Sequence, residues 1–466
     1  MNRMRFNRAP GLLLVLSLVF LAACSGGSSS TPPPPGSAPL SVTVKDAPPA
    51  GVTVLSFEVT ITGAVLQPGN VSLVSTPIEI EVKQLEVETA FLNTINVPAG
   101  TYNSLQLTVA NPELTIKNDT ASAIGTCAAG AVCEIKPSVS TSVTINFATP
   151  LAITANTPAG LVIDVNLSNL IGSSLTIDFN AANGFTVQQL TGVGFPTGQL
   201  EEVELEGTVA NKATDQFTLQ TSNGDFTVKV DSNTQFEDFD GASPTCTTSN
   251  FACVQNGQVV EVELSLMAGG MLVAKEVEFE DGAIDDELEG VIVSIDSPTQ
   301  FKMVVTEELR NIANIDVGNA VTVTLALGTQ FRVDDGGLTV PATQKTLFEG
   351  SVDTSQLMVG QTVQVRRLGT SSGTAIDTDR VRLRGTRFTA TVASVTPPNF
   401  VVNVLPALFT AQGISQIQVQ TSSQTDFDNA PNGLGSLATG NMVSLRGLLF
   451  KNLPDPILVA KKVRKR

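Results

Sequence analysis

The chain has 466 residues and a net charge of −17, and it contains no histidine, no tryptophan and one tyrosine. Without histidine it cannot build a Ser-His-Asp or Cys-His nucleophile, a histidine-ligated zinc site or the usual general base near neutral pH. The pairs Gly269-Gly270 and Gly336-Gly337 lack the lysine and helix start of a phosphate-binding loop. The composition therefore predicts a non-enzymatic protein without a cofactor.

The N-terminus is typical of a secretion signal. Three arginines lie within the first eight residues, and the apolar run 11–23 follows them. This run is shorter than the about 20 apolar residues that span a membrane. It ends in Leu-Ala-Ala-Cys24, which resembles the lipobox of bacterial lipoproteins. The alternative is an ordinary signal peptide with a chance cysteine, but the position of these residues at the end of the run favours the lipobox.

The lipobox resemblance implies a lipid anchor. Residues 1–23 would be removed, and Cys24 would carry a diacylglycerol thioether and an acylated amine, such as a palmitate. Two or three acyl chains give stable anchoring. Residues 24–38, rich in Ser, Gly and Pro, predict a tether. Ser25, in place of Asp, favours the outer membrane over the inner one, so we expect a location in the cell envelope with membrane lipid as a partner.

The rest of the sequence predicts an all-β fold. It is rich in Val, Thr, Gly, Ser and Asn, and no segment keeps a helical period over three turns. Alternation of polar and apolar residues with period two is widespread, as in residues 203–209, VELEGTV.

Four further cysteines form two close pairs, Cys127 with Cys133 and Cys246 with Cys253. In an oxidising compartment this spacing predicts two local loop disulfides. A zinc site built from all four is the alternative. The two pairs lie in different predicted domains, however, and neither has the usual short ligand spacing.

Two motifs define a first domain over residues 39–198. The first is PLSVTVKDAP, beginning at Pro39, and the second is VPAGTYNSLQL, beginning at Val97. In this order they resemble the bacterial family called domain of unknown function 4382, although Lys45 and Val97 stand where Thr and Leu are usual. We expect a β-sandwich-like domain, in which the single tyrosine, Tyr102, acts as a structural latch that packs its ring and bonds its hydroxyl locally.

The remaining chain repeats three landmarks in the same order, in units 201–282, 286–384 and 386–464. They are a Thr-x-Phe strand end, a Gly-x-x-Val turn and strand, and a closing strand. Their first residues are Thr234, Thr329 and Thr425; Gly257, Gly360 and Gly440; and Ala274, Thr378 and Ala460. The pattern resembles the family called domain of unknown function 5666 and predicts three small OB-like β-barrels of five or six strands, with Val, Phe and Leu inside.

Charge is distributed unevenly over these repeats. Residues 201–289 carry twenty Asp or Glu against three Lys, a net charge of −17, and their acids alternate with apolar residues. The alternating acids are Glu202, Glu204 and Glu206, and Glu276, Glu278 and Glu280. We interpret them as a solvated outer barrel face. The alternative is a divalent-cation site, with Asp281, Asp285 and Asp286 as further oxygen donors; sequence leaves its ligands unknown.

The last unit is basic instead. Residues 386–466 carry eight Lys or Arg against three Asp, a net charge of +5, and end in KKVRKR at 461–466. This tail would either contact anionic lipid headgroups or a polyanion, or be a solvated end. We expect no nucleic-acid partner, because OB-like barrels bind it through a positive groove with exposed aromatic residues and the acidic first unit would repel phosphate.

These observations predict a membrane-anchored envelope lipoprotein with a non-enzymatic binding, adhesion or scaffolding role, whose partner is an envelope protein or a glycan. The first alternative is a divalent-cation-binding structural module. A second is an enzyme that works through carboxylates alone, which would need a cleft with convergent Asp or Glu.

Overall fold

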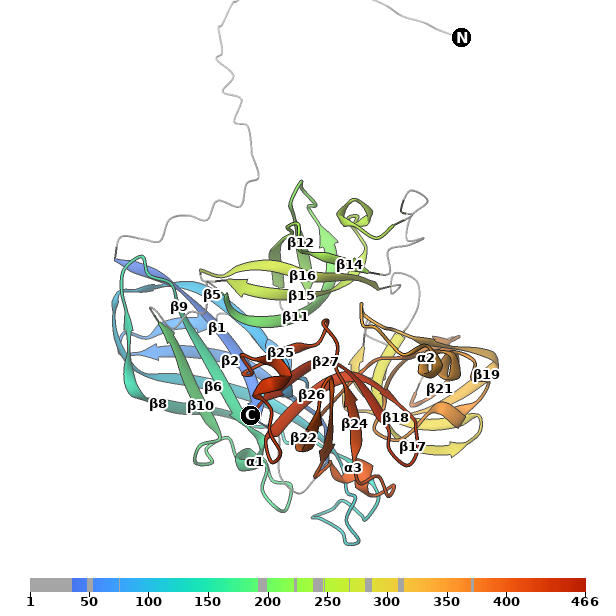
Figure 1. The fold of residues 1–466 in the computed structure, drawn as a ribbon. Helices are drawn as coiled ribbons and strands as arrows, with labels where there is room; N and C mark the ends of the chain where they lie inside the picture. The colour runs from blue at the N-terminus through green and yellow to red at the C-terminus, as the bar shows by residue number, and fades with distance from the viewer. Residues whose placement is uncertain are drawn as a thin grey trace, which may run out of the picture.

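A computed structural model describes residues 36–47, 53–74, 76–191, 199–221, 224–237, 246, 248–267, 269–280, 287–308, 314–369 and 373–466. The predicted signal peptide and Cys24 lie outside these ranges, as do Asp281, Asp285 and Asp286. Within them, no helix is long and apolar enough to cross a membrane. Strands make up most of the described part of the chain, as predicted (Figure 1).

The N-terminal domain packs two sheets face to face. One has the order β10-β9-β1-β5, and the other β3-β2-β6-β7, with β4 added to β2 and β8 added to β6. The elements are β1 (Ser37–Ala47), β2 (Thr53–Gln67), β3 (Val71–Val74), β4 (Ile78–Glu81), η1 (Val82–Glu86), β5 (Ala90–Pro98), β6 (Gly100–Lys117), β7 (Val132–Ile135), β8 (Ser140–Ile153), β9 (Ala159–Asn166), α1 (Leu167–Leu170) and β10 (Phe185–Thr191). We call this domain the sandwich.

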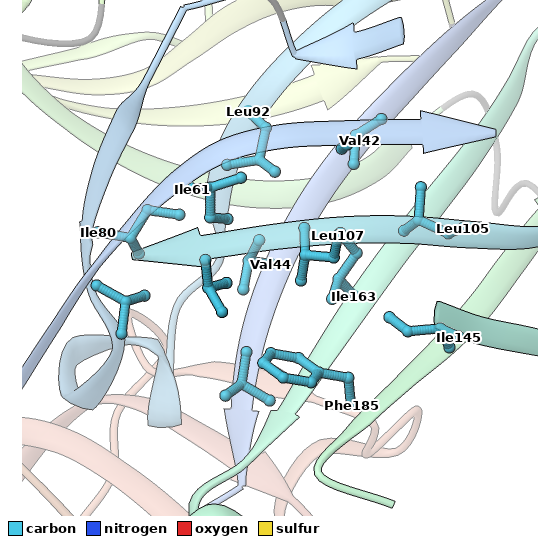
Figure 2. Close-up of a cluster of buried hydrophobic side chains, with 14 of the residues drawn as sticks. Val42, Val44, Ile61, Ile80, Leu92, Leu105, Leu107, Ile145, Ile163 and Phe185 are labelled. Atoms are coloured by element: carbon cyan, nitrogen blue, oxygen red, sulfur yellow. The ribbon is translucent and has the colours of Figure 1, made fainter. Parts of the chain in front are cut away.

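The core of the sandwich lies between its two sheets. Inward-facing residues alternate along each strand, as with Val42 and Val44 of β1, and they meet Ile61 and Leu107 from the other sheet (Figure 2). The predicted tyrosine latch is confirmed, because Tyr102 is buried and its hydroxyl donates a hydrogen bond of 2.9 Å to the carbonyl of Pro98.

Three closed barrels follow, one for each predicted repeat. The first contains β11 (Gln199–Ala210), β12 (Gln216–Thr221), β13 (Gly224–Lys229), β14 (Gln235–Glu237), η3 (Phe251–Cys253), β15 (Val259–Met267) and β16 (Met271–Glu280). The second contains β17 (Glu287–Ser297), β18 (Gln300–Glu308), β19 (Ala320–Val333), α2 (Ala342–Glu349), η4 (Thr354–Gln356), β20 (Thr362–Leu368) and β21 (Ala375–Leu383). The third contains β22 (Gly385–Thr396), β23 (Asn399–Asn403), α3 (Ala407–Thr410), β24 (Ile417–Gln420), β25 (Asp426–Asp428), η5 (Gly433–Ser436), β26 (Met442–Phe450) and β27 (Ile457–Lys465).

The three barrels share one topology. The opening strand pairs with the second strand and with the strand before last, and the third strand closes the barrel by pairing parallel to the last one. The Thr-x-Phe segment also pairs parallel to the last strand. It forms a separate short strand in the first and third repeats, β14 and β25, and is continuous with the third strand in β19. This order of five strands confirms the OB-like prediction.

The repeated landmarks are explained by shared hydrogen bonds. In every barrel the threonine of Thr-x-Phe donates its hydroxyl hydrogen to the carbonyl of the first residue in the closing landmark, at 2.8, 3.0 and 2.8 Å. The pairs are Thr234 with Ala274, Thr329 with Thr378, and Thr425 with Ala460. This bond fixes the strand end against the last strand, so the first and third landmarks recur together.

The Gly landmark is a turn that only glycine adopts without strain. Gly257, Gly360 and Gly440 have φ values of 90°, 94° and 88°. The amide side chain of the next residue folds back and accepts a hydrogen bond from the backbone N–H three residues earlier, as Gln361 does from Met358 at 2.6 Å. All three landmarks are therefore structural.

A second glycine position shows how tightly the barrels coil. Gly207 and Gly290 occupy equivalent places in the opening strands, opposite Val260 and Val363. A Cβ at Gly290 would lie 2.4 Å from the carbonyl oxygen of Val304 on the second strand. Because that atom belongs to the backbone, the barrel itself would have to shift to make room.

We expect Gly290→Ala to lower the stability of the second repeat by about 1–3 kcal/mol, the usual range for overpacking. Gly63→Ala, in β2 of the sandwich, is the matched control. A Cβ at Gly63 would lie 3.8 Å from its nearest atom, the hydroxyl oxygen of Thr108, which is an ordinary contact. Thermal unfolding followed by circular dichroism measures both. Equal melting temperatures for the two variants would contradict the close approach.

Candidate functional site

The four cysteines form the two predicted disulfides, Cys127–Cys133 in the sandwich and Cys246–Cys253 in the first barrel. Both pairs are closed within single domains, so the four sulfurs do not come together as a zinc site would require.

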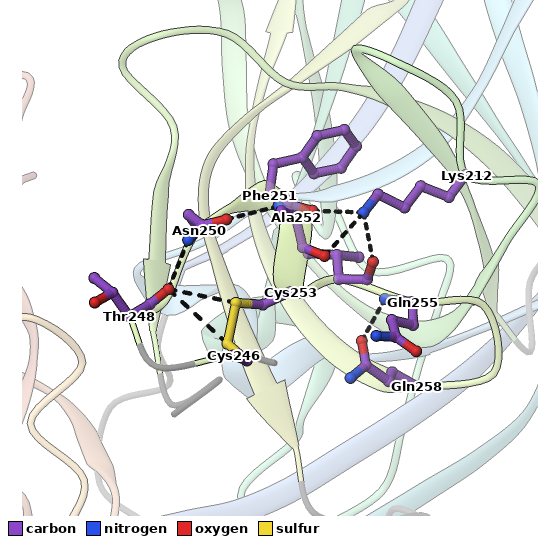
Figure 3. The surroundings of a disulfide bond; sticks show 10 residues. Lys212, Cys246, Thr248, Asn250, Phe251, Ala252, Cys253, Gln255 and Gln258 are labelled. Carbon is purple, nitrogen blue, oxygen red and sulfur yellow. Dashed lines mark hydrogen bonds between the residues drawn. A yellow bond between two sulfur atoms is a disulfide. The ribbon is translucent and has the colours of Figure 1, made fainter. Parts of the chain in front are cut away.

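The second disulfide sits beside a lysine that holds its loop in place (Figure 3). The ammonium of Lys212 donates hydrogen bonds to the carbonyls of Phe251 and Val254 at 2.7 and 2.6 Å, and lies 4.6 Å from the centre of the Phe251 ring. Burial lowers the pKa of Lys212. These contacts satisfy carbonyls at the end of η3, so this lysine has a structural role.

The charged residues of the repeats converge on one junction between all four domains. Six side chains form a closed ring in which acids and bases alternate, and their side chains are only 7–14% exposed. In ring order they are Glu88 of the sandwich, Arg446 of the third repeat, Glu261 of the first repeat, Arg384 and Glu289 of the second repeat, and Arg387 of the third repeat. We call this arrangement the ion ring.

The distances around the ion ring are those of direct ion pairs. Arg446 lies 2.9 Å from Glu88 and 3.4 Å from Glu261. Arg384 lies 2.6 Å from Glu261 and 2.9 Å from Glu289. Arg387 closes the ring, with 3.7 Å to Glu289 and 3.2 Å to Glu88. The ring joins every domain to the others and is itself neutral.

Additional carboxylates surround Arg384. Its guanidinium also contacts Asp334 and lies 3.4 Å from Glu278. Although burial acts to raise the pKa of Asp334, Arg384 and Arg382 hold it down to about 2. Burial and the neighbouring Glu289 raise the pKa of Glu307 to about 7. The junction therefore contains both a firmly ionised and an easily protonated carboxyl group.

Alternating acidic residues of the first repeat, among them Glu276 and Glu278, face this junction and not solvent. Lys461 of the third repeat lies 3.3 Å from Glu276 and 3.8 Å from Glu263. Glu278 is 6% exposed. The predicted solvated face is therefore wrong for these residues, because cations from other repeats cover them. The side chains of Glu202, Glu204 and Glu280 lie outside the described residues.

Most of the basic C-terminal run packs against other parts of the chain, which corrects the prediction of a solvated end, although Arg466 is exposed. It forms β27, in which Lys462 and Arg464 are 5% and 3% exposed. Arg464 lies 2.5 Å from Asp428 and donates to the carbonyl of Glu88 at 3.3 Å. Arg466 donates to the carbonyl of Glu86 at 2.6 Å. The tail anchors the third repeat to the sandwich.

A cavity of about 190 Å³ lies at the ion ring. Carboxylates converge on it, as the carboxylate-only enzyme would require, and several of them are paired with arginines, as Glu88 and Glu261 are with Arg446. The cavity is also smaller than the roughly 300–1,000 Å³ typical of small-molecule sites. Among the described residues, no group of three or more Asp, Glu or Cys is arranged to hold a metal ion. The geometry is therefore that of a network of ion pairs between domains.

No motif in the sequence predicts the ion ring. Its only signal was the opposite charge of the first and third repeats, which indicates complementary surfaces without naming which residues meet.

Comparison with known families confirms the resemblance of the sandwich and, for the second family, the resemblance of the first repeat. The model of domain of unknown function 4382 matches residues 37–193, and that of domain of unknown function 5666 matches residues 206–278. A comparison with curated proteins gives no match.

Among solved structures, the crystal structure of a multidomain protein with nucleic acid binding domains from Streptococcus pneumoniae TIGR4 aligns with 56% of this chain and 72% of its own. The sequence identity is 8% and the TM-score 0.11, so the alignment carries no argument about fold or function.

We predict that Arg384→Met destabilises the protein by about 3–5 kcal/mol, because it leaves several buried carboxylates without their cation. Arg366→Met is the matched control. Its pair with Asp379, at 2.7 Å, is about one-third exposed, so its loss should cost less than about 1 kcal/mol. Urea denaturation compares the two. Equal urea denaturation midpoints for the two variants would contradict a stabilising role of the ion ring.

We predict that Glu307→Gln stabilises the protein at about pH 8 but not at about pH 4.5. The raised pKa of Glu307 in the folded state means that its contribution is fully present below the unfolded value of 4.5 and is lost as the pH rises through about 7. Gln mimics the protonated form, so the gain at high pH should be on the order of 1–3 kcal/mol. Urea denaturation at both pH values measures the difference in unfolding free energy between Glu307→Gln and the wild type. A difference that is the same at both pH values would contradict the raised pKa of Glu307.

Proposed function

We propose that this protein is a lipid-anchored envelope protein that acts as a non-enzymatic binding or scaffolding body. The anchor rests on the sequence Leu-Ala-Ala-Cys24 after a short apolar run and on the tether behind it. The envelope location is supported by the two disulfides, since such bonds persist in oxidising compartments. We place the protein on the outer membrane, with an envelope protein or a glycan as its partner.

The observation that carries the scaffolding role is the ion ring. Domains of one chain move relative to one another by default, whereas a buried ring that takes residues from each of the four domains would fix their relative positions. A body with fixed surfaces loses less conformational freedom when it binds. The chain also lacks histidine, and the carboxylates of the ion ring are used in ion pairs. Both features favour binding over catalysis.

The anchor is tested by Cys24→Ser in the full-length chain. We expect the wild-type protein to incorporate radiolabelled palmitate and to sediment with membranes, and the variant to do neither. Ser28→Ala, four residues further along the tether, is the control and should behave as wild type. A Cys24→Ser protein that is still cleaved at the same bond and retained in the membrane fraction would contradict the anchor.

The binding role is tested separately, by pull-down from solubilised envelopes with residues 36–466 as bait. This segment contains every described strand and all core clusters. Enrichment of one envelope protein or glycan that Arg384→Met abolishes would support a partner that needs the assembled body. Recovery of neither would remove the binding role while leaving the anchor standing.

A further inference from the structure

The strand β8 has one edge that pairs with no other strand of the described residues. Its other edge pairs antiparallel with β6, from Ala110 opposite Ser140 to Ser104 opposite Asn146, without a register shift in this run. In Figure 1, β8 lies on the side of the sandwich away from the second repeat. Residues 140–146 therefore form a regular strand edge that the barrels do not cover.

The hydrogen bonds to β6 show which backbone groups of this edge point outward. The N–H of Asn111 donates to the carbonyl of Val139 at 3.1 Å, so these two residues form a hydrogen-bonded pair. Such pairs alternate along an antiparallel ladder. Thr141, Val143 and Ile145 therefore bond to β6. The residues that alternate with them direct their N–H and C=O groups away from β6, and these are Ser140, Ser142, Thr144 and Asn146.

This edge lacks the features that usually prevent strands from pairing. Proteins protect exposed edges with charged side chains, proline, bulges or very short strands. Residues 137–163 contain no Asp, Glu, Lys or Arg, although the chain has a net charge of −17. Other edge strands of the sandwich are protected, since β3, β4 and β7 have four residues each and Phe91 of β5 packs on Phe226 of the first repeat.

Apolar side chains along the same edge are incompletely covered. Val143 and Phe147 lie on the inner face with Ile145, but they are only partly buried at the margin of the core. Val139, which precedes the strand on the same face, is 39% exposed. A further strand added to β8 would extend the sheet and cover these side chains.

The backbone of this edge is complementary to a second copy of itself. When Val143 lies on a two-fold axis, Ser142 is opposite Thr144 of the second copy, and Ser140 is opposite Asn146. Each of these residues directs its N–H and C=O outward, so every donor meets an acceptor. An isologous pairing of this kind uses the same residues on both copies.

The side chains fit the same two-fold axis. On the inner face, Val143 lies opposite Val143 of the second copy, and Val139 lies opposite Phe147. Aromatic and β-branched pairs of this kind stabilise neighbouring strands, whereas like charges directly opposite one another are destabilising. The edge brings no like charges together, because it has none. Both faces of the strand therefore favour a second copy as the occupant.

We propose that two copies of this protein pair through residues 140–146 of β8, antiparallel about a two-fold axis at Val143. Their sandwiches then share one continuous sheet. An interface of one strand is smaller than about 1,000 Å² and is therefore weak, with a Kd of about 1–100 µM. This self-association goes beyond the proposed binding role and does not depend on it.

The axis is tested by cross-linking of residues 36–466, in which the four cysteines form the two disulfides. Val143→Cys places two sulfurs opposite each other, so we expect a disulfide-linked dimer after mild oxidation. Ser142→Cys, one position away, is the matched control. Its Cα atoms in the two copies would be more than about 7 Å apart, which is too far for a disulfide.

The edge is tested by sedimentation equilibrium over a concentration series. Thr144→Pro removes an outward N–H and leaves the ladder with β6 intact, and Ser142→Lys adds a charge to the edge. We expect both to weaken self-association at least about tenfold. Thr62→Lys, on an exposed position of the interior strand β2, adds the same charge and should associate like the wild type. Thermal unfolding confirms that each variant is folded.

A wild type that stays monomeric throughout the series would overturn the proposal. Equal cross-linking of Val143→Cys and Ser142→Cys would overturn the axis, and equal association of Thr144→Pro and Thr62→Lys would overturn the edge. A monomeric wild type that captures an envelope protein, which Thr144→Pro then fails to capture, would assign the edge to a different partner. Membrane retention through Cys24 is unaffected by any of these results.

Discussion

The architecture depends on one buried guanidinium. Arg384 is enclosed by carboxylates from two repeats, and a charge in that position is tolerated only when its partners are in place. Its partners Glu261 and Glu289 are in turn bonded to Arg446 and Arg387 of the third repeat. The cost of leaving any member unpaired therefore extends to all of them, and this couples the domains in addition to the apolar contacts between them.

The uneven charge of the chain follows from this arrangement. An acidic first repeat and a basic third repeat would each be poorly neutralised alone, but together they cover one another at the junction. Neutral contacts add to the fit: Phe91 of the sandwich meets Phe226 of the first repeat edge-to-face, and Gln361 of the second repeat donates to the carbonyl of Leu449 of the third at 2.8 Å. In Figure 1 the third repeat lies between the sandwich and the second repeat, where such contacts are possible.

Sequence patterns predicted the features that depend on interactions within one domain. Alternation gave the strands, the spacing of the cysteines gave both disulfides, and repeated landmarks such as Thr234 and Gly257 gave the barrels, because each landmark serves a turn or a strand end within its own repeat. The resemblance of the first domain to domain of unknown function 4382 is confirmed by the family model.

Patterns failed where residues from different repeats meet. The alternating acids around Glu276 have the same period whether they face water or Lys461, and a basic strand such as β27 looks the same whether exposed or buried. Whether a strand face is buried against another domain depends on how the domains pack together, and the local sequence pattern does not show this.

The central claim, that the ion ring fixes the four domains as one body, is tested most directly by small-angle X-ray scattering of residues 36–466 with and without Arg446→Glu. This change places a third carboxylate between Glu88 and Glu261. The account predicts a compact wild type whose radius of gyration does not change with moderate salt, because buried pairs are weakly screened, and a clearly larger radius for the variant. Identical scattering from both proteins would contradict it.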